Sequence, residues 1–483
     1  MSEGKKLMLF SHVCNTRSIT GAEKLLLFLA RKLSLHFACT IVAPQEGKLT
    51  KLARESGIQT ILLETPMLYI MCAPNENLNR EAQRLKNDPS TACVIQLLER
   101  ERPDYVFVNT SVNVIPAMAA KALGIPVIWH ITEIIRDNPH TDSAVAIIDR
   151  YSDWIVGISE TAVAPFRGNP VEYKVSLLYP SWGADEFRPA LWSELRNSKR
   201  KEWGIKADAK VIGYISSFLI VEKGADHFIE SVAGLGKLNP GLRFVVIGGE
   251  VDRVYYQSLK RRVIDSGRSS QFIFIDYEED IEGAYCAMDI VVIPSLLNEG
   301  FGMTAMEAMI CGKPVVAYAS GGLREILQFT GNEQYLVPTG DKEGLTAKIS
   351  QLLVSPETSD TVGLENQRRV EAMFGSGAYE TRLLSILGHI FSLSGIPVPM
   401  EEMLYTPPVE ATATLVPEVQ APVPGTAKQG RRRRRRKLRR RLSLRKRRRV
   451  ISAKKRTGRK IKRKPRRIAR GRKRNRRLAS RRR

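Results

Sequence analysis

The residues best suited to chemistry lie in one short segment, which runs from Glu299 to Glu307. Gly300 and Gly302 allow backbone N–H groups to approach a ligand closely. We expect a helix to begin at about Met303, and its first N–H groups suit a phosphate or sugar oxygen. Carboxylates beside such a helix start can accept hydrogen bonds from neighbouring hydroxyls. The segment therefore predicts a site for a ligand that carries both hydroxyls and phosphate.

Three other places could contribute to such a site. Lys223, which precedes a predicted helix, could neutralise a phosphate or could be an ordinary solvated lysine. His130 ends the predicted strand Val127–His130, where it could face a ligand or serve a structural role. The turn Thr20-Gly21-Ala22-Glu23 opens a helix, and it could approach a ligand through Gly21 or could simply cap that helix.

The elements that must position these residues alternate between strands and helices. This alternation predicts parallel sheets covered on both faces. Glycine and proline punctuate the series, as they do at the ends of strands and helices. The predicted strands of the first half are Leu7–Phe10, Cys39–Ala43, Tyr105–Asn109, Val127–His130 and Trp154–Ile158, and those of the second are Val211–Ile215, Phe244–Ile247, Phe272–Ile275, Ile290–Pro294 and Val315–Ala319.

The alternation therefore predicts an α/β chain with two Rossmann-like domains joined near residue 190. Neither domain carries a GxGxxG segment after its first strand, which disfavours a dinucleotide oxidoreductase. Proline-rich and charged stretches follow the second domain. We divide the chain into a first domain at 1–190, a second domain at 191–375, a closing helix at 376–395, a Pro-rich linker at 396–430 and a disordered Arg/Lys-rich tail at 431–483.

The charge is divided unevenly along the 483 residues. The formal net charge is +26, but residues 431–483 hold 34 Lys plus Arg and no acidic residue. Residues 1–430 keep 42 basic and 50 acidic residues, a net charge of −8. The tail lacks the apolar residues needed for a core and should bind polyanions such as nucleic acid, anionic lipid or an anionic polymer. A charged appendage without a defined partner is the alternative.

Cysteine usage and hydropathy predict a cytoplasmic protein. The six cysteines are scattered and form no CxxC pair, which is typical of reduced thiols. No signal peptide is expected, and no apolar run reaches the roughly 18–20 residues that span a bilayer. Any association with a membrane or another polyanionic surface should therefore be peripheral.

A family resemblance becomes specific when the surroundings of the two glutamates are read together. The pattern EGFGxxxxEAMxxGxPVVA, followed by GG and Glu325, resembles family 4 of the retaining glycosyltransferases. That resemblance implies the GT-B fold, in which two Rossmann-like domains face each other across a cleft. The resemblance covers most of residues 1–390. It implies a hexosyltransferase-like enzyme that takes a sugar from a nucleotide diphosphate with retention of configuration, without metal or any cofactor besides the donor substrate.

The resemblance also assigns roles to individual residues. It implies that Glu299 contacts the donor sugar together with the amides of Gly300, Phe301 and Gly302, and that Glu307 binds the ribose. Lys223 would bind the diphosphate.

In the rest of the cleft the resemblance implies that Tyr277 contacts the base. Gly21 would approach the donor from the first domain, and His130 would face the donor sugar across the cleft. The segment Tyr285–Asp289 would serve packing.

One position departs from the family pattern. The family has an arginine five residues before the lysine, and this chain has Phe218 there. Arg243, Arg253, Arg261 and Arg324 are available as substitutes, and the sequence does not choose among them. The alternative function is therefore an inactive, transferase-like body that serves as a polyanion-binding structural protein. A nucleotide-sugar epimerase is a third hypothesis, which the EGFG segment disfavours.

The acceptor has no signature in the sequence. Residues 60–100 and 131–145 should shape its pocket, and neither stretch has an interpretable pattern. The acceptor therefore stays an unknown glycan, lipid or protein.

Overall fold

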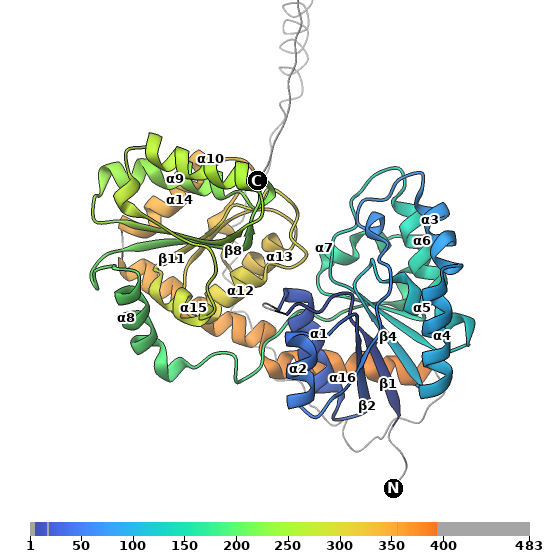
Figure 1. Ribbon diagram of the computed structural model, residues 1–483. Coiled ribbons are helices and arrows are strands. Elements are labelled where there is room, and N and C mark those ends of the chain that lie inside the picture. Colours follow the sequence, from blue (N-terminus) through green and yellow to red (C-terminus); the bar gives the residue numbers. More distant parts are fainter. Residues whose placement is uncertain (1–4, 17–18, 355, 394–483) are drawn as a thin grey trace, which may run out of the picture. The chain divides into compact units, whose positions relative to one another are not determined.

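The computed structural model describes residues 5–16, 19–354 and 356–393. The predicted linker and tail, at 396–430 and 431–483, lie outside these residues, as do the last two residues of the predicted closing helix. Within the described residues two separate parallel sheets form (Figure 1), which confirms the predicted α/β fold. We call each sheet with the helices packed on it a lobe.

The first sheet has the strand order β3-β2-β1-β4-β5-β6-β7, and its paired strands are parallel. The order reverses between β1 and β4, and parallel sheets bind ligands outside the carboxyl ends of strands at such a point. The strands are β1 (Lys6–Phe10), β2 (Ala38–Ala43), β3 (Gln59–Leu62), β4 (Tyr105–Asn109), β5 (Val127–Ile131), β6 (Trp154–Gly157) and β7 (Val175–Leu177).

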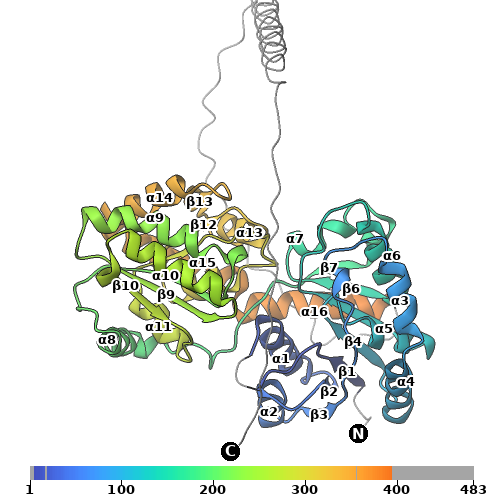
Figure 2. The same cartoon turned by 45° about the horizontal axis from the view of Figure 1, so that its top comes forward.

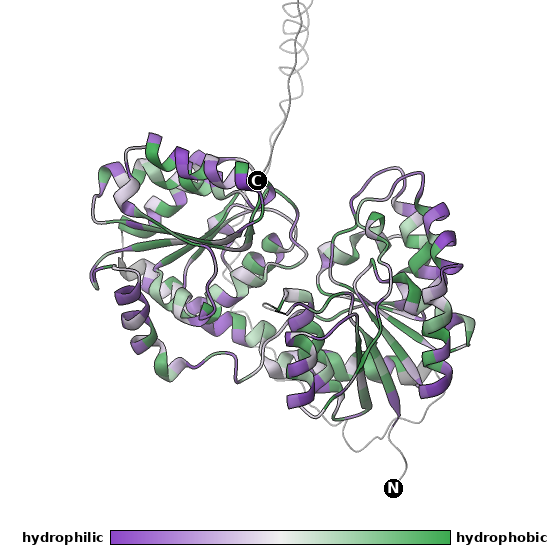
Figure 3. Ribbon diagram, viewed as in Figure 1, coloured by the Kyte–Doolittle hydropathy of each residue, from purple (hydrophilic) through white to green (hydrophobic). Residues whose placement is uncertain are grey.

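Helices cover both faces of the first sheet. One face carries α3, α4, α5 and α6, and the other carries α1 and α2 (Figures 1 and 2). Apolar residues gather on the strands and on the inward sides of the helices (Figure 3), as burial of apolar surface requires. The helices are α1 (Gly21–Leu33), α2 (Lys48–Glu55), α3 (Leu78–Lys86), α4 (Pro89–Glu101), α5 (Val114–Ala122), α6 (Thr141–Tyr151) and α7 (Glu160–Val163).

The second sheet has the order β10-β9-β8-β11-β12-β13, and its strand order reverses between β8 and β11. Its paired strands are also parallel. The loops after β8 and β11 therefore meet at the carboxyl edge of this sheet. The strands are β8 (Val211–Leu219), β9 (Arg243–Glu250), β10 (Phe272–Ile275), β11 (Ile290–Ile293), β12 (Val315–Tyr318) and β13 (Leu336–Val337).

The helices of the second lobe again lie on both faces of the sheet. In Figure 1, α9, α10 and α14 lie on one face, while α8, α12 and α15 lie on the other. The bounds are α8 (Trp192–Glu202), α9 (Ala225–Leu238), α10 (Arg253–Asp265), α11 (Ile281–Ala287), α12 (Met303–Ile310), α13 (Gly322–Phe329), α14 (Lys342–Val354) and α15 (Pro356–Phe374).

The last described helix, α16 (Ser376–Leu393), returns to the first lobe. Its buried residues Tyr379, Leu383 and Leu387 belong to the same apolar cluster as Leu7 and Leu9 of β1. The ring of Phe28 on α1 lies edge-on to Tyr379, with 4.9 Å between centroids. The end of the body therefore completes the core of the lobe in which the chain began. Among the described helices, none combines the length and the apolar character needed to cross a membrane.

Candidate active site

A cavity of about 340 Å³ lies where the carboxyl edges of the two sheets meet. Residues of both lobes line it, as expected for a cleft between two domains. The first lobe contributes Gly21, Ala22, Leu25, Thr132, Glu133 and Ile158, and the second contributes the β8 residues Tyr214 to Ser216, Lys223, Ile293, Ser295, Glu299 to Thr304 and Leu323.

The closest charged pair in the cavity joins Lys223 to Glu299. Lys223 Nζ lies 2.7 Å from one carboxylate oxygen of Glu299 and 2.9 Å from the other. Lys223 stands in the turn after β8, and Glu299 stands in the loop after β11. Because these two strands flank the point where the strand order reverses, the fold places a cation and a carboxylate within reach of one ligand.

The backbone around Glu299 is held in place by the segment before α13. Glu299 forms an isolated parallel bridge with Gly321, and the N–H of Gly322 donates to the carbonyl of Glu299 at 2.8 Å. Gly302 has a φ of 108°, which disfavours other residues, and α12 begins immediately after it. Met303 and Thr304, the first two residues of α12, line the cavity, so their backbone N–H groups can bind an anion there.

Gly300 and Phe301 connect this loop to neighbouring segments. A Cβ on Gly300 would lie 2.7 Å from the carbonyl oxygen of Thr132, so only glycine permits this contact between the lobes. The ring of Phe301 is buried and lies 5.2 Å from that of Phe374. Since its side chain belongs to the core, Phe301 can offer a ligand only its backbone.

Glu307 lies beyond the cavity wall and makes contacts of its own. Lys24 of α1 is 3.3 Å from one of its oxygens, and the hydroxyl of Tyr285 donates to the other at 2.9 Å. The carboxylate raises the pKa of Lys24 through their attraction. Tyr285, which we expected to serve packing, therefore also orients Glu307. The ribose role of Glu307 stays a prediction.

The turn before α1 is a helix cap and also part of the cavity wall. Thr20 and Glu23 form a capping box, in which each side chain bonds the backbone of the other residue. Gly21 lines the cavity and lies close to Met303 at the start of α12. The two interpretations of this turn are therefore compatible.

His130 does not line the cavity. Its ring is buried on β5, with Nδ1 3.0 Å from the side-chain oxygen of Asn109 and the ring of Phe107 beside it. Burial lowers the pKa of His130 to about 4, so the ring is neutral near pH 7. Its contact with a donor sugar stays a prediction, as does the contact of the base with Tyr277, which is 60% exposed.

Sequence reasoning missed two carboxylates at this junction. Glu133 lines the cavity from the first lobe, three residues beyond His130. Glu325 accepts hydrogen bonds from the N–H groups of Glu160 and Thr161, so a residue of α13 caps α7 of the other lobe. Glu325 belongs to the family-like pattern, and Glu133 lies in the stretch 131–145. Neither pattern indicates that the residue would face the opposite lobe. Among the described residues no group of three His, Cys, Asp or Glu could hold a metal ion.

Phe218 lies in β8, which extends further than predicted. It pairs with Gly249 after an irregularity in register, and its side chain is 51% exposed. Arg243 bonds the carbonyls of Pro240 and Leu242 at the amino end of β9, so it cannot serve the carboxyl edge.

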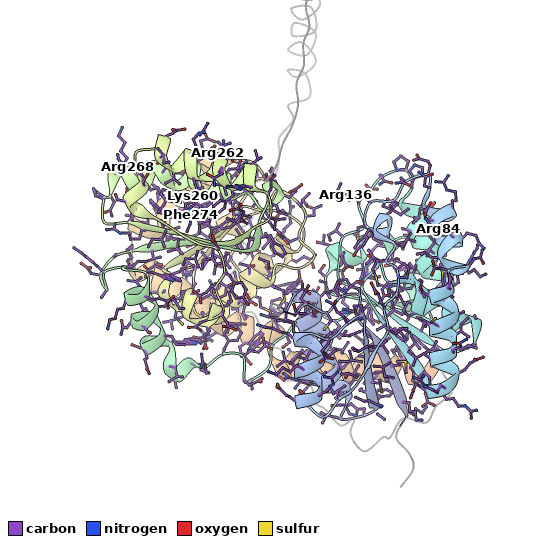
Figure 4. All side chains as sticks on the ribbon, in the orientation of Figure 1. Arg84, Arg136, Lys260, Arg262, Arg268 and Phe274 are labelled. Atoms are coloured by element: carbon purple, nitrogen blue, oxygen red, sulfur yellow. The ribbon has the colours of Figure 1, made fainter. Side chains whose placement is uncertain are left out.

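Two cations of α10 have partners outside the cavity lining. On α10, Lys260 lies 3.7 Å from the ring centroid of Phe274, and Arg262 pairs with Glu230 (Figure 4). Lys24 and Lys223 are therefore the cations that the structure brings to Glu307 and Glu299.

A known family model matches the part of the chain that carries Lys223, Glu299 and Glu307. Residues 196–369 match the family model described as "Glycosyl transferases group 1". The matched segment lies within the second lobe. It contains Lys223, Glu299 and Glu307, together with the strands that position them.

Two named transferases are among the curated proteins to which the chain is similar. A D-inositol 3-phosphate glycosyltransferase of Mycobacteroides abscessus is 31% identical over 217 residues, which are 43% of this chain and 46% of that protein. A 2-deoxystreptamine N-acetyl-D-glucosaminyltransferase of Streptomyces fradiae is 31% identical over 160 residues, or 32% of this chain and 36% of that protein. The chain therefore spans less than half the length of these two relatives.

Solved structures resemble a larger part of the chain. The crystal structure of Anabaena HepE in complex with UDP-glucose has a TM-score of 0.65 at 20% identity and covers 80% of this chain and 99% of that one. The structure of WaaG, a glycosyltransferase involved in lipopolysaccharide biosynthesis, has a TM-score of 0.54 at 13% identity and covers 79% and 98%. At these identities the likeness establishes the GT-B fold of both lobes.

Proposed function

We propose that this protein transfers a sugar from a nucleotide diphosphate to an acceptor hydroxyl, with retention of configuration and without a metal ion. The observation that carries the proposal is the contact of Lys223 with both carboxylate oxygens of Glu299, beside the amino end of α12. One cation, one carboxylate and the N–H groups at the start of α12 match the diphosphate and the hydroxyls of a nucleotide sugar.

In this proposal each residue has one task. Glu299 accepts hydrogen bonds from donor sugar hydroxyls, and Lys223 with the N–H groups of α12 neutralises the charge that grows on the departing diphosphate. The C–O bond to the diphosphate breaks as the acceptor oxygen bonds the anomeric carbon from the same face. Closure of the two lobes around the donor would exclude water and limit hydrolysis.

Glu307 would bind the ribose of the donor. Its carboxylate is already oriented by Tyr285 and Lys24, so little side-chain freedom would be lost on binding. Lys24 would supply the first lobe's share of positive charge near the nucleotide, where the family's arginine is replaced by Phe218.

The test is a binding and turnover experiment with the full chain. We expect at least one of UDP-glucose, UDP-N-acetylglucosamine and GDP-mannose to bind in isothermal titration calorimetry and to be hydrolysed slowly. The anomeric form of the freshly released sugar, read by NMR before mutarotation, reports retention. If none of the three binds and Glu307→Ala changes nothing, the alternative of an inactive body with a structural role is correct.

The basic segment 431–483 lies outside the described residues, and its proposed partner rests on charge alone. We propose that it binds polyanions, which would hold a cytoplasmic enzyme at a membrane or another anionic surface. Its 34 basic residues should give an affinity for random-sequence duplex DNA, used as a probe, that falls steeply with salt. Deletion of 431–483 should abolish that affinity and leave nucleotide-sugar affinity unchanged. An equal loss of both would contradict the proposal.

A further inference from the structure

Glu133 is the one carboxylate that the first lobe places in the cavity wall, as far as the described residues show. It follows β5. The carbonyl of the preceding residue, Thr132, lies against Gly300 in the loop that carries Glu299, so close that it leaves no room for a Cβ there. The first lobe is the side from which an acceptor must approach a donor bound to the second lobe. Glu133 therefore stands on the acceptor side of the proposed reaction.

The hydrogen bonds of Glu133 leave room for one more donor. One carboxylate oxygen accepts from the N–H and the hydroxyl of Ser111, at 3.0 and 3.2 Å. From neighbouring residues in the described part of the chain, the other accepts one hydrogen bond, from the hydroxyl of Thr132 at 2.9 Å. Because a carboxylate oxygen can accept two hydrogen bonds, the second oxygen has a free position, and the residue lines an open cavity.

No cation balances this charge in the part of the chain that the structure describes. No lysine, arginine or histidine there forms an ion pair with Glu133, although Glu299 across the cavity has Lys223. Burial of an unpaired carboxylate costs free energy, and it raises the pKa of Glu133 above that of an exposed glutamate. Such a cost is typical of functional positions, because packing alone does not require the charge.

The support beneath Glu133 is strained. Thr110, the residue before Ser111, has a φ of 77°, which is unusual for a β-branched side chain. The indole N–H of Trp129 donates to its carbonyl at 2.8 Å, and the buried Thr110 hydroxyl has no hydrogen-bond partner among the described residues. This conformation aims the Ser111 N–H at the Glu133 carboxylate. Strain that fixes one carboxylate at a cavity wall is a known feature of active sites.

We propose that Glu133 is the base that receives the proton of the acceptor hydroxyl. This step rests on the proposed transferase function. As the acceptor oxygen bonds the anomeric carbon, the O–H bond breaks and its proton passes to the free position on the carboxylate. The C–O bond to the diphosphate breaks at the same time and its electron pair leaves with the diphosphate, so the step needs no other reactant.

None of the titratable groups described around Glu133 is better placed to act as the base on the first-lobe side of the cavity. Cys72 Sγ lies 3.6 Å from the Ser111 hydroxyl, and burial raises the pKa of that thiol. His130, on the preceding strand, is bonded to Asn109 and does not line the cavity. Arg136 lies further along the same loop at the surface (Figure 4). Across the cavity, Glu299 is paired with Lys223.

The experiment compares wild type and Glu133→Gln, as full chains, with UDP-glucose first and then the other two nucleotide sugars named above. Water serves as the acceptor, and sodium azide serves as an acceptor that has no proton to lose. We expect Glu133→Gln to lower hydrolysis by roughly 100-fold or more while the Kd for UDP stays within about twofold. Azide should restore turnover in this variant as glycosyl azide, without a comparable gain in wild type.

Control variants separate a chemical role from a structural one. Glu99→Gln changes an exposed glutamate of the same lobe and should behave as wild type. Glu133→Asp keeps a carboxylate on a side chain that is one methylene shorter, and it should retain more activity than Glu133→Gln.

Each remaining outcome overturns the inference. Unchanged hydrolysis in Glu133→Gln would assign the proton to the leaving diphosphate. A loss that azide does not restore, or that comes with weaker UDP binding, would make Glu133 a structural residue. If wild type itself neither binds nor hydrolyses any of the three donors, the proposed function fails first and this step fails with it.

Discussion

The two carboxyl edges that enclose the cavity are built differently. In the second lobe, Glu299, the glycines after it and Glu307 lie within nine consecutive residues, and only Lys223 comes from elsewhere. In the first lobe, Gly21 begins α1, while Ser111 and Glu133 lie in the loops after β4 and β5, so the three come from segments far apart in the chain. The difference teaches that a compact motif is visible in a sequence, whereas a site assembled from several loops becomes visible only in the fold.

The electrostatics of the two edges also differ. The second lobe balances its carboxylate with a lysine, while the first lobe leaves Glu133 without a cation in the described residues and His130 neutral. A balanced pair suits recognition of a charged donor. An unpaired carboxylate beside neutral groups suits proton transfer to or from a hydroxyl.

The largest effect should come from the charge pair of the second lobe. Lys223→Met should lower donor hydrolysis by roughly 100- to 1,000-fold, because the cation offsets charge on the leaving group. It should also leave Glu299 without its ionic partner. Initial rates with the bound nucleotide sugar measure the effect. Lys51→Met, at a lysine that is 74% exposed on α2, should change nothing. Equal activity in the two variants would contradict the assigned role of Lys223.

The next effect concerns the neutral histidine of the first lobe. Burial lowers the pKa of His130 from 6.5 to about 4, so the unfolded chain binds a proton in this range and the folded chain does not. Stability should therefore fall as the pH drops from about 6.5 to about 4, by roughly 3 kcal/mol from this group. Urea unfolding midpoints across this range measure it.

His130→Gln provides the comparison for that measurement. Its amide can still bond Asn109 but does not titrate, so the free energy of unfolding should depend less on pH than in wild type. His36→Gln, at an exposed position, should retain the full dependence. An identical pH dependence in all three proteins would show that folding does not lower the pKa of His130.

The smallest effect should come from the contact that ties the two edges together. Glu325→Ala removes the cap that α13 provides to α7 and should lower the free energy of unfolding by about 1 kcal/mol. Glu279→Ala removes a more exposed contact between the lobes, in which Glu279 lies 3.6 Å from Lys48, and should cost less than about 0.5 kcal/mol. Denaturant midpoints at constant pH measure both. A larger loss in Glu279→Ala would reverse the comparison.

The fold could be predicted because its signal is local and repeated. Short apolar runs separated by amphipathic stretches lead to parallel strands with helices between them, wherever the strands finally lie. The helices α3 and α4 are not predicted from the sequence. Both lie largely in the stretch 60–100, which we expect to shape the acceptor pocket. The extension of β8 to Leu219 also escaped, because an irregular register has no simple sequence pattern.

The sequence by itself determined the α/β class, and it singled out Lys223 and the segment from Glu299 to Glu307 as candidate site residues. These features depend on neighbouring residues or on a spacing that helices and strands impose. Only the tertiary structure decided that Lys223 contacts Glu299, that Lys24 reaches Glu307, and that Glu133 rather than His130 lines the cavity. Such contacts depend on strand order and on how two lobes meet, and both are set by long-range packing that no local pattern records.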